Sequence, residues 1–190
     1  ITIGGIATYN GYQITVGGST TNYTGTVTYA SMGATLMAEV KNNNTSEVGG
    51  IVSRNYGTIS YSGVIDGAYL KVNWVGGVAV VNDATGKITN TFNKGIIEVY
   101  DRNTTTEFSS VYAGGLVASN SGDIDNSYSI AEFIMNRDSN LLYYVGGLIG
   151  VNNNMNVTNI GLSNNYTVFR LHSNNAVNST NASAEIGAVI

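Results

Sequence analysis

The stretch VGGIVSRN at residues 48–55 decides the fold, because the same pattern returns along the chain. It recurs as VGGVAVVN at residues 75–82, AGGLVASN at residues 113–120 and VGGLIGVN at residues 145–152, and the N-terminal IGGIATYN at residues 3–10 keeps the register. In all five copies an asparagine lies six residues after the first glycine. A unit repeated in this way is typical of architectures in which each repeat packs only on its neighbours.

The repeats begin near residues 3, 48, 75, 113, 145 and 186, and the last one is cut short as IGAVI at residues 186–190. Successive first glycines are 45, 27, 38 and 32 residues apart, so a constant unit alternates with insertions of variable length. We expect insertions at residues 12–48, 101–112 and 136–144, projecting from one edge of the fold. Since the pattern starts and stops within a repeat, we also expect the chain to be a fragment of a longer array.

Short runs rich in β-branched residues, such as IIEVY at residues 96–100 and IAEFIM at residues 130–135, predict strands separated by Gly or Asn. Only ASMGATLMAEVK at residues 30–41 resembles a helix, and its interior Gly33 argues against one. A unit with three short strands cannot bury its apolar face alone, but stacked units share one core. The sequence therefore predicts a single all-β domain over residues 1–190, a right-handed parallel β-helix (β-solenoid) of about five to six rungs.

The glycine pairs predict a tight corner in every rung. Glycine has no Cβ, so it permits positive φ and close approach of two backbones. The predicted corner residues are Gly4, Gly5, Gly49, Gly50, Gly76, Gly77, Gly114, Gly115, Gly146 and Gly147.

The repeated asparagine precedes a turn, where its side chain can cap its own backbone. Stacked rungs would bring these amides together as a hydrogen-bonded ladder, a structural device rather than a ligand site. The predicted ladder consists of Asn10, Asn55, Asn82, Asn120 and Asn152. We also expect Tyr61, Phe92 and Tyr128 to share one slot of the repeat and to form a structural column instead of a ligand platform.

The composition excludes several partners. Charged residues make up 11% of the chain, against about 25% in an average protein, and the net charge is −4. The basic residues are scattered, so we expect no nucleic acid, which needs clustered cations, and no membrane insertion. The absence of Cys excludes disulfides and Cys-ligated zinc.

Little in the sequence indicates catalysis. Hydrolysis of glycans needs paired carboxylates, and only Asp123 and Asp125 share a strand face. His172 is the only histidine, so it cannot build a metal site or a triad alone. We therefore expect no enzymatic activity and no cofactor. The one alternative to an absent cofactor is a bound Ca²⁺ ion, with Asp123 and Asp125 among its ligands.

Eight Asn-x-Ser/Thr acceptors for N-glycosylation are present, and none is followed by Pro. If the source glycosylates its surface proteins, these would carry sugar. The acceptors are Asn22, Asn43, Asn44, Asn103, Asn156, Asn165, Asn178 and Asn181.

The unit GGLVASNSGDIDNSY at residues 114–128 resembles the GLUG repeat, G-G-L-V-G-x-N-x-G-x-I-x-N-S-Y. That repeat occurs in arrays on large bacterial and archaeal surface proteins, including adhesin-like ones, and has no agreed catalytic or ligand residues. The match covers residues 48–160 well and the two ends weakly. After the copy at residues 75–82 the turn glycine, Gly86, comes two residues later than in the other copies. The copy at residues 145–152 is followed by neither the turn Gly nor the Tyr.

The resemblance implies a non-enzymatic, extracellular, structural or adhesive module at a cell surface. Its expected partners are neighbouring repeats or subunits packed end to end, and a host or cell-surface glycan or protein. Open sheet edges at both ends leave a second interpretation, the subunit of a self-assembling extracellular filament. A third is a glycan-binding or glycan-cleaving β-helix.

Overall fold

The computed structural model describes residues 1–38, 45–100, 110–136 and 142–153, together with short strands at 162–163, 166–167, 170–173 and 183–187. Over these ranges the regular elements are all strands, which confirms the prediction of an all-β protein. None of the described residues forms a helix that is long and apolar enough to cross a membrane.

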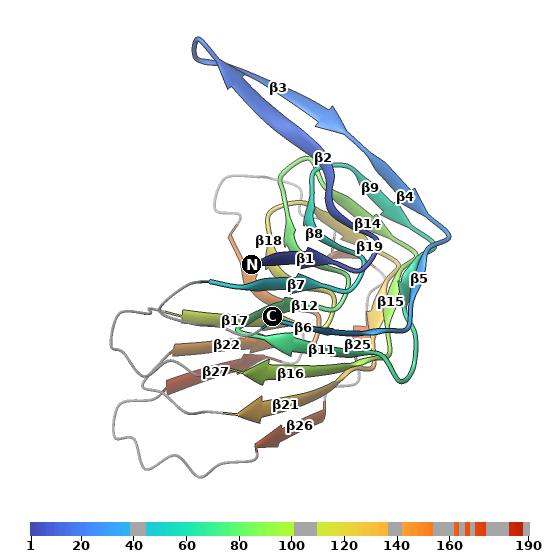
Figure 1. The fold of residues 1–190 in the computed structure, drawn as a ribbon, viewed down its shortest axis with the longest axis vertical. Helices are drawn as coiled ribbons and strands as arrows, with labels where there is room; N and C mark the ends of the chain where they lie inside the picture. The colour runs from blue at the N-terminus through green and yellow to red at the C-terminus, as the bar shows by residue number, and fades with distance from the viewer. Residues whose placement is uncertain are drawn as a thin grey trace.

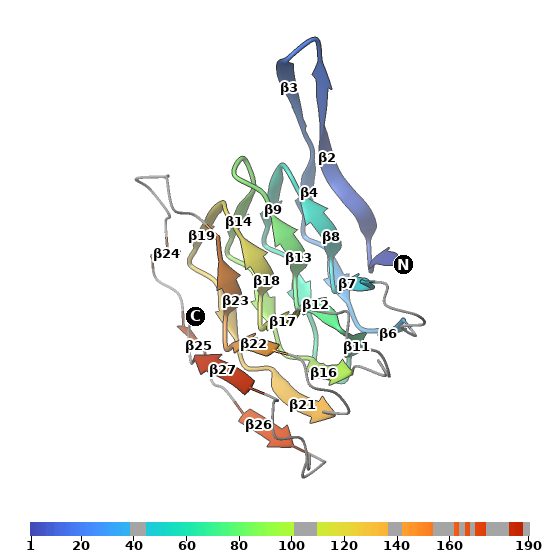
Figure 2. The ribbon, with the colours of Figure 1, turned by 90° about the vertical axis from the view of Figure 1, so that its left-hand side faces the viewer.

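The described strands form five sheets, and the chain visits them in a fixed order. One passage through the five sheets is called a turn below, and the sheets are numbered in the order in which a turn visits them. The neighbours within each sheet come from successive turns, and they pair in parallel, except that β2 and β3 form an antiparallel hairpin. Figure 2 shows the successive turns side by side, from the N-terminal turn to the C-terminal one.

Sheet 1 contains β1 (Thr2–Gly4), β7 (Glu47–Gly49), β12 (Trp74–Gly76), β17 (Ser110–Gly114), β22 (Leu142–Gly146) and β27 (Ser183–Gly187). Sheet 2 contains β2 (Ala7–Val16), β3 (Ser19–Thr24), β8 (Val52–Asn55), β13 (Ala79–Asn82), β18 (Val117–Asn120) and β23 (Ile149–Asn152). Sheet 3 contains β4 (Thr26–Thr28), β9 (Thr58–Ser60), β14 (Lys87–Thr89), β19 (Asp123–Asp125) and β24 (Leu162–Ser163).

Sheet 4 contains β5 (Ser31–Met32), β10 (Gly63–Val64), β15 (Phe92–Asn93), β20 (Tyr128–Ser129) and β25 (Tyr166–Thr167). Sheet 5 contains β6 (Thr35–Met37), β11 (Tyr69–Val72), β16 (Ile96–Tyr100), β21 (Glu132–Asn136) and β26 (Arg170–Ser173). Each turn therefore has five strands in the described residues, and the prediction of three strands per repeat is wrong. The sequence correctly predicted two strands of sheet 5, at residues 96–100 and 130–135, but not the strands of sheet 4, which are only two residues long.

The core lies inside the turns and is continuous from one turn to the next. One inward slot of sheet 3 is filled by Ile59, Ile88 and Ile124, which are direct strand partners and fully buried. In sheet 5 the inward slot is filled by Leu70, Ile97 and Phe133 in the same way. Burying such side chains contributes about 1.5–3 kcal/mol each. A turn without neighbours would leave them in water, so the core exists only in the stack.

The segment at residues 12–48 is not the single insertion that the sequence predicts. Of its described residues, only the first part leaves the stack, as the hairpin formed by the distal half of β2 and by β3. Strands β4, β5 and β6 then complete the first turn by pairing with β9, β10 and β11. The stretch at residues 30–41, which resembles a helix in sequence, contains the strands β5 and β6. This agrees with the expectation that the interior Gly33 disfavours a helix.

The two further insertions expected at residues 101–112 and 136–144 lie partly outside the described residues, and their described ends belong to β17, β21 and β22. They fall between sheet 5 and sheet 1. The hairpin instead leaves the turn between sheets 2 and 3, and Figures 1 and 2 show it projecting from the stack. Because the middle of each of the other two insertions lies outside the described residues, the prediction that all insertions project from one edge stays a prediction.

Candidate functional site

The first glycines of the predicted corners are direct partners across the stack. Pairing in sheet 1 joins Gly4 to Gly49, Gly49 to Gly76, Gly76 to Gly114 and Gly114 to Gly146, and it continues to Gly187. A Cβ on Gly76 would lie 1.7 Å from the carbonyl oxygen of Ala79. The same clash, at 1.7–1.8 Å, occurs for Gly4, Gly49, Gly114 and Gly146. The chain bends back on itself so sharply here that no side chain fits.

The second glycine of each pair is needed for a different reason. A Cβ on Gly77 would lie 2.0 Å from the carbonyl oxygen of Gly115 in the next turn and 2.2 Å from Nδ2 of Asn93, a sheet-4 residue of its own turn. In the turn before it, Gly50 faces Val64 in the same manner. Among the described residues the glycines with positive φ are Gly11, Gly17, Gly18 and Gly67. The corner pairs therefore use close approach, and the positive φ that the sequence also suggested for them is wrong.

The asparagines six residues after each first glycine are joined by hydrogen bonds from their amide nitrogens. Nδ2 of Asn10 donates to Oδ1 of Asn55 at 2.8 Å, and Nδ2 of Asn55 donates to Oδ1 of Asn82 at 2.8 Å. Nδ2 of Asn82 donates to Oδ1 of Asn120 at 2.9 Å, and Nδ2 of Asn120 to Oδ1 of Asn152 at 3.2 Å. The first four of these side chains are buried, so the ladder satisfies polar groups that water cannot reach.

A second row of buried hydroxyl groups lies at the corner between sheets 3 and 4. Oγ of Ser62 donates to the carbonyl oxygen of Ser60 and accepts from the backbone N–H of Ala30 in the preceding turn. Oγ of Ser127 likewise accepts from the N–H of Thr91. The sequence analysis did not identify this row. Its signal is a Ser or Thr two residues before the last residue of the sheet-4 strands β10, β15 and β20, which becomes visible only when the repeats are aligned beyond the asparagine.

An aromatic column stands on sheet 1, one residue before the Val-Gly-Gly or Ala-Gly-Gly unit. Trp74 contacts Tyr112 edge to face, with ring centroids 4.5 Å apart, and Tyr112 stacks on Tyr144 at 5.2 Å. Nε1 of Trp74 donates to the carbonyl oxygen of Ser110. These rings are half-buried and contact one another across the turns, so they stabilise the stack.

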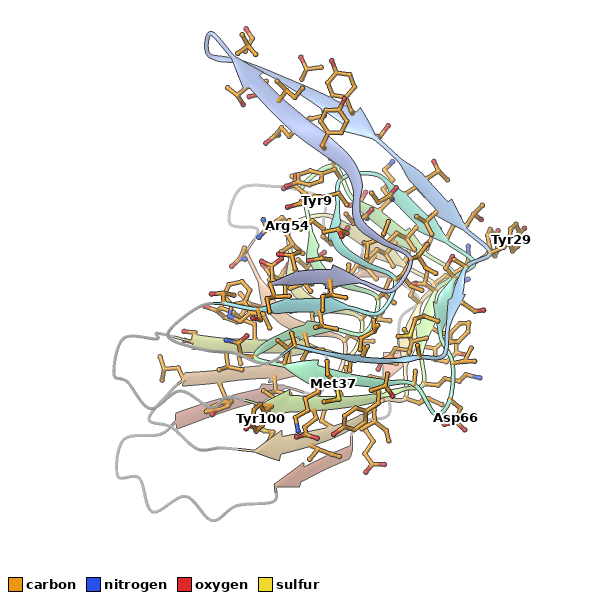
Figure 3. The ribbon with its side chains drawn as sticks, in the orientation of Figure 1. Tyr9, Tyr29, Met37, Arg54, Asp66 and Tyr100 are labelled. Atoms are coloured by element: carbon orange, nitrogen blue, oxygen red, sulfur yellow. The ribbon has the colours of Figure 1, made fainter. Side chains whose placement is uncertain are left out.

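Glu47 occupies the same column one turn earlier and is paired with Arg54. The two form a bidentate pair, in which Nη2 of Arg54 donates to Oε1 at 2.6 Å and Nε to Oε2 at 3.3 Å, while Oγ of Ser53 also donates to Oε2. The hydrogen bond to Glu47 raises the pKa of the Arg54 guanidinium above its usual value, against the lowering effect of its partial burial. Tyr9 precedes Arg54 in the same outward column of sheet 2, and Figure 3 shows both side chains on one side of the body.

The three aromatics expected to share a slot do not do so. Phe92 and Tyr128 are direct partners in sheet 4, with ring centroids 5.7 Å apart, but their partner in the second turn is Gly63. Tyr61 lies two residues earlier, at the corner, and stacks on Tyr29 of the first turn at 5.3 Å. The prediction fails because the aromatic ring of the second turn stands on the corner residue itself, whereas Phe92 and Tyr128 lie two residues after their corner residues, Asn90 and Asn126.

The acidic residues that the structure describes do not converge on a metal site. Asp123 and Asp125 point outward from β19 beside Lys87 and Thr89. Across the part of the chain that the structure describes, no three His, Asp or Glu side chains lie close enough to hold a metal ion. Among the N-glycosylation acceptors, Asn22 lies exposed on β3, where its Oδ1 accepts a hydrogen bond from Gln13. The seven others lie outside the described residues.

The first turn differs from the rest in charge and exposure. The sequence has no charged side chain before Glu39, so the whole first turn and its hairpin are neutral. Ile6 is 49% exposed, whereas the residues that occupy its slot in the next turns, Ile51 and Val78, are fully buried. Comparison of the chain with protein-family models, with curated proteins and with solved structures finds no match.

Proposed function

We propose that the chain is a parallel β-helix, a module of a GLUG-type repeat array that serves as a non-enzymatic structural and adhesive element outside the cell, at the cell surface. The observation that carries the proposal is the cross-turn asparagine ladder, from Asn10 to Asn152. It joins successive turns by buried polar contacts that do not depend on salt or on a ligand. A rod stabilised in this way suits a rigid extension that holds variable surfaces away from a cell.

The outer surface supports the same role. Only 11% of residues are charged, and the outward slots of sheet 3 hold mainly hydroxyl groups, among them Thr28, Ser60 and Thr89. Such a surface stays hydrated over a wide range of salt concentration, because its solubility does not depend on screened charges.

The proposal is tested on cells of the source organism. Antibodies against residues 1–190 are expected to label intact cells, and brief protease treatment from outside is expected to remove the label. A chain that is stained only after the cells are permeabilised would contradict the surface role. A cytoplasmic reference protein, stained in parallel, controls for cell integrity.

A second function, end-to-end assembly into a filament, is favoured by the neutral first turn. Among the described strands, β1, β4, β5 and β6 of this turn each stand at the end of their sheet, and natural proteins usually protect such edges with charge. Here Ile6 is exposed, and no charged side chain lies between Ile1 and Ala38. The surface that would pack on the first turn is the last turn of a second copy, because successive turns within the chain already pair in register.

Ile6→Lys tests the assembly, because it places a charge on the open end. The control is Ile65→Lys, which alters a side chain of similar exposure, 43%, in the second turn, away from the open end. Light scattering and electron microscopy of concentrated protein are expected to show linear particles for the wild type and for Ile65→Lys, and monomers for Ile6→Lys. Monomers of the wild type at all concentrations would exclude the filament.

A further inference from the structure

The asparagine ladder has an acceptor without a donor at its N-terminal end. Within the ladder each Oδ1 accepts from the turn before it, so Oδ1 of Asn55 accepts from Asn10 and Oδ1 of Asn82 accepts from Asn55. Oδ1 of Asn10 has no such neighbour, and no N–H or O–H group of the described residues donates to it. Asn10 is nonetheless only 4% exposed. Because buried acceptors in native proteins normally have a donor, the ladder is incomplete at this end.

The opposite end of the ladder carries the complementary group. Asn152 ends β23, which is the last described strand of sheet 2 at the C-terminal end of the stack. Oδ1 of Asn152 accepts from Asn120, so its amide nitrogen lies on the far side of the amide group, beyond the fifth turn. A second copy whose first turn packs on the fifth turn would bring Oδ1 of its Asn10 to this donor, in the geometry that already joins successive turns.

The open edge of the first turn is accessible to such a copy. Figure 2 shows β1 at the N-terminal end of the stack, with the hairpin projecting away from it. Ile6 is 49% exposed and Tyr9 54% exposed. No charged side chain precedes Glu39, so no charge has to be removed from water when another turn packs on this one.

Sheet 1 determines how the two turns can meet. It has six described strands, whereas sheets 3, 4 and 5 have five each, because β27 begins a sixth turn. If the first turn of a second copy packs on β23, β24, β25 and β26, its β1 falls on the place that β27 occupies beside β22. The two strands cannot pair with β22 along the same edge, so one of them must replace the other.

The residues of β1 suit this place. The Ile-Gly of β1 pairs with a Val-Gly unit in β7, and the Ile-Gly of β27 pairs with a Val-Gly unit in β22 in the same register. In sequence β1 belongs to a complete Ile-Gly-Gly unit, whereas β27 belongs to Ile-Gly-Ala. The second glycine is the one whose Cβ would clash with the next turn, as at Gly5, where it would lie 2.1 Å from the carbonyl oxygen of Gly50. A stack that continues therefore favours β1.

The opposite replacement, β27 on β7, is disfavoured by charge. With the corner glycines in register, Glu185 of β27 would stand directly opposite Glu47 of β7. Like charges on direct strand partners are destabilising, and Glu47 is a buried carboxylate whose ion-pair partner is Arg54. In β1 the same position is held by Thr2, which has no charge.

We propose that copies of this chain join head to tail by strand replacement. β1 of one copy takes the place of β27 beside β22 of the next copy, and Nδ2 of Asn152 donates to Oδ1 of Asn10 across the junction. The inference rests on the end-to-end assembly proposed above as a second function, for which it names the polarity, the register and the polar contact of the junction. Turns of different copies are then held by the same contacts as turns of one chain.

Introduced disulfides test the polarity. Tyr9 and Val151 occupy one outward column of sheet 2, four turns apart. Within a chain this is about 19 Å, too far for a disulfide, but across the proposed junction the two residues are direct partners. Tyr9→Cys/Val151→Cys is expected to give covalent dimers, trimers and higher oligomers on a non-reducing gel. The matched control, Tyr9→Cys/Ser119→Cys, moves the second cysteine one turn back, to about 10 Å across the junction, and is expected to give no such series.

A reversible lock tests the strand replacement. Tyr144 and Glu185 are direct partners in β22 and β27, so Tyr144→Cys/Glu185→Cys is expected to form a disulfide within the chain that fixes β27 in place. The oxidised variant is expected to stay monomeric in light scattering under conditions in which the wild type assembles. After reduction it is expected to assemble as the wild type does. Circular dichroism of both forms checks that they are folded.

Equal oligomer series from the two cysteine pairs, covalent dimers alone, or assembly of the oxidised lock variant would overturn the inference. Linear particles of the wild type together with no covalent series would overturn this mode of joining and leave the assembly itself standing. A wild type that is monomeric at all concentrations would instead remove the assembly on which the inference rests. The labelling of intact cells still tests the surface role separately.

Discussion

Nδ2 of Asn82 donates a hydrogen bond to Oδ1 of Asn120 across 2.9 Å, although the two residues are 38 positions apart in the chain. Asn82 also accepts from Nδ2 of Asn55 at 2.8 Å, so it has a partner on each side in the ladder. Both groups are buried, and each bond links one turn to the next. The interior of the stack is therefore held together by polar contacts as well as by its aliphatic core.

Asn82→Ala is expected to lower the free energy of unfolding by about 2–5 kcal/mol. The variant leaves a donor on Asn55 and an acceptor on Asn120 buried without partners, and each such group costs about 1–3 kcal/mol. Urea denaturation measures the loss. Asn22→Ala, on the exposed hairpin, is the control and is expected to change stability by less than about 0.5 kcal/mol. Equal effects of the two substitutions would show that the ladder contributes nothing specific.

Gly77→Ala is expected to prevent stable folding or to cost more than about 3 kcal/mol, because its Cβ would meet a carbonyl oxygen of the next turn at 2.0 Å. Gly17→Ala is the informative comparison. Gly17 has a φ of 59° but nothing within 4 Å of an added Cβ, so only backbone strain of about 1 kcal/mol is expected. Thermal unfolding of the two variants separates close approach from positive φ, and a mild effect at Gly77 would refute the close approach.

Arg54→Met is expected to lower stability by about 1–3 kcal/mol, because it leaves the buried carboxylate of Glu47 with only Ser53 as a hydrogen-bond donor among its three present contacts. Glu47→Gln in the same background is expected to restore part of the loss by removing the charge. A double variant as unstable as Arg54→Met would argue against an unpaired charge as the cause.

The same substitution has a defined pH behaviour. The pKa of Arg54 is raised in the folded state, so its stabilising effect is fully present below the ordinary arginine pKa and is lost only as the pH rises past the folded-state value. The stability difference between wild type and Arg54→Met is therefore expected to be the same at about pH 6 and about pH 9. A difference that disappears at the higher of these pH values would contradict the assignment.

Tyr61→Asn is expected to change the free energy of unfolding by less than about 1 kcal/mol, because relief of strain at the positive φ of Tyr61 offsets the loss of stacking on Tyr29. Tyr143→Ala, which removes a fully buried ring, is expected to cost about 3–5 kcal/mol. Chemical denaturation of both variants makes the comparison. A large loss at Tyr61 would mean that the stacked ring contributes to the stability of the fold.

The class of the fold could be predicted because two residue types occupy fixed positions. A pair of glycines and an asparagine six residues later recur without any change of spacing, and in the structure the first glycines pair and the asparagines bond across the turns. These positions are constrained by the sharp bend within each unit and by contacts across the turns, so their spacing stays readable despite insertions between the units. The same logic did not extend to Tyr61, whose distance from the corner differs from that of Phe92 and Tyr128.

The equivalence of Tyr29 and Tyr61 at one corner could not be predicted from the sequence. Tyr29 belongs to a turn whose repeat is interrupted by the hairpin, so its equivalence to Tyr61 is hidden until the strands are paired. Positive φ at a tyrosine is equally invisible in the sequence, because nothing in the residue type suggests it. The absence of charged side chains before Glu39 could be seen in the sequence. Its bearing on assembly, however, follows only once the structure shows which strands stand at the end of a sheet.

Cross-linking of adjacent turns tests the central claim, in-register stacking, most directly. Because the chain has no native Cys, only the two introduced cysteines of each variant can form an intramolecular disulfide. Thr58 and Lys87 are direct partners on neighbouring turns, and Ser60 lies two residues farther along the same strand as Thr58. Thr58→Cys/Lys87→Cys is expected to form a disulfide rapidly under mild oxidation, whereas Ser60→Cys/Lys87→Cys, offset by more than about 7 Å, is not. Equal cross-linking of the two pairs, or cross-linking of the offset pair alone, would contradict the register on which the whole account depends.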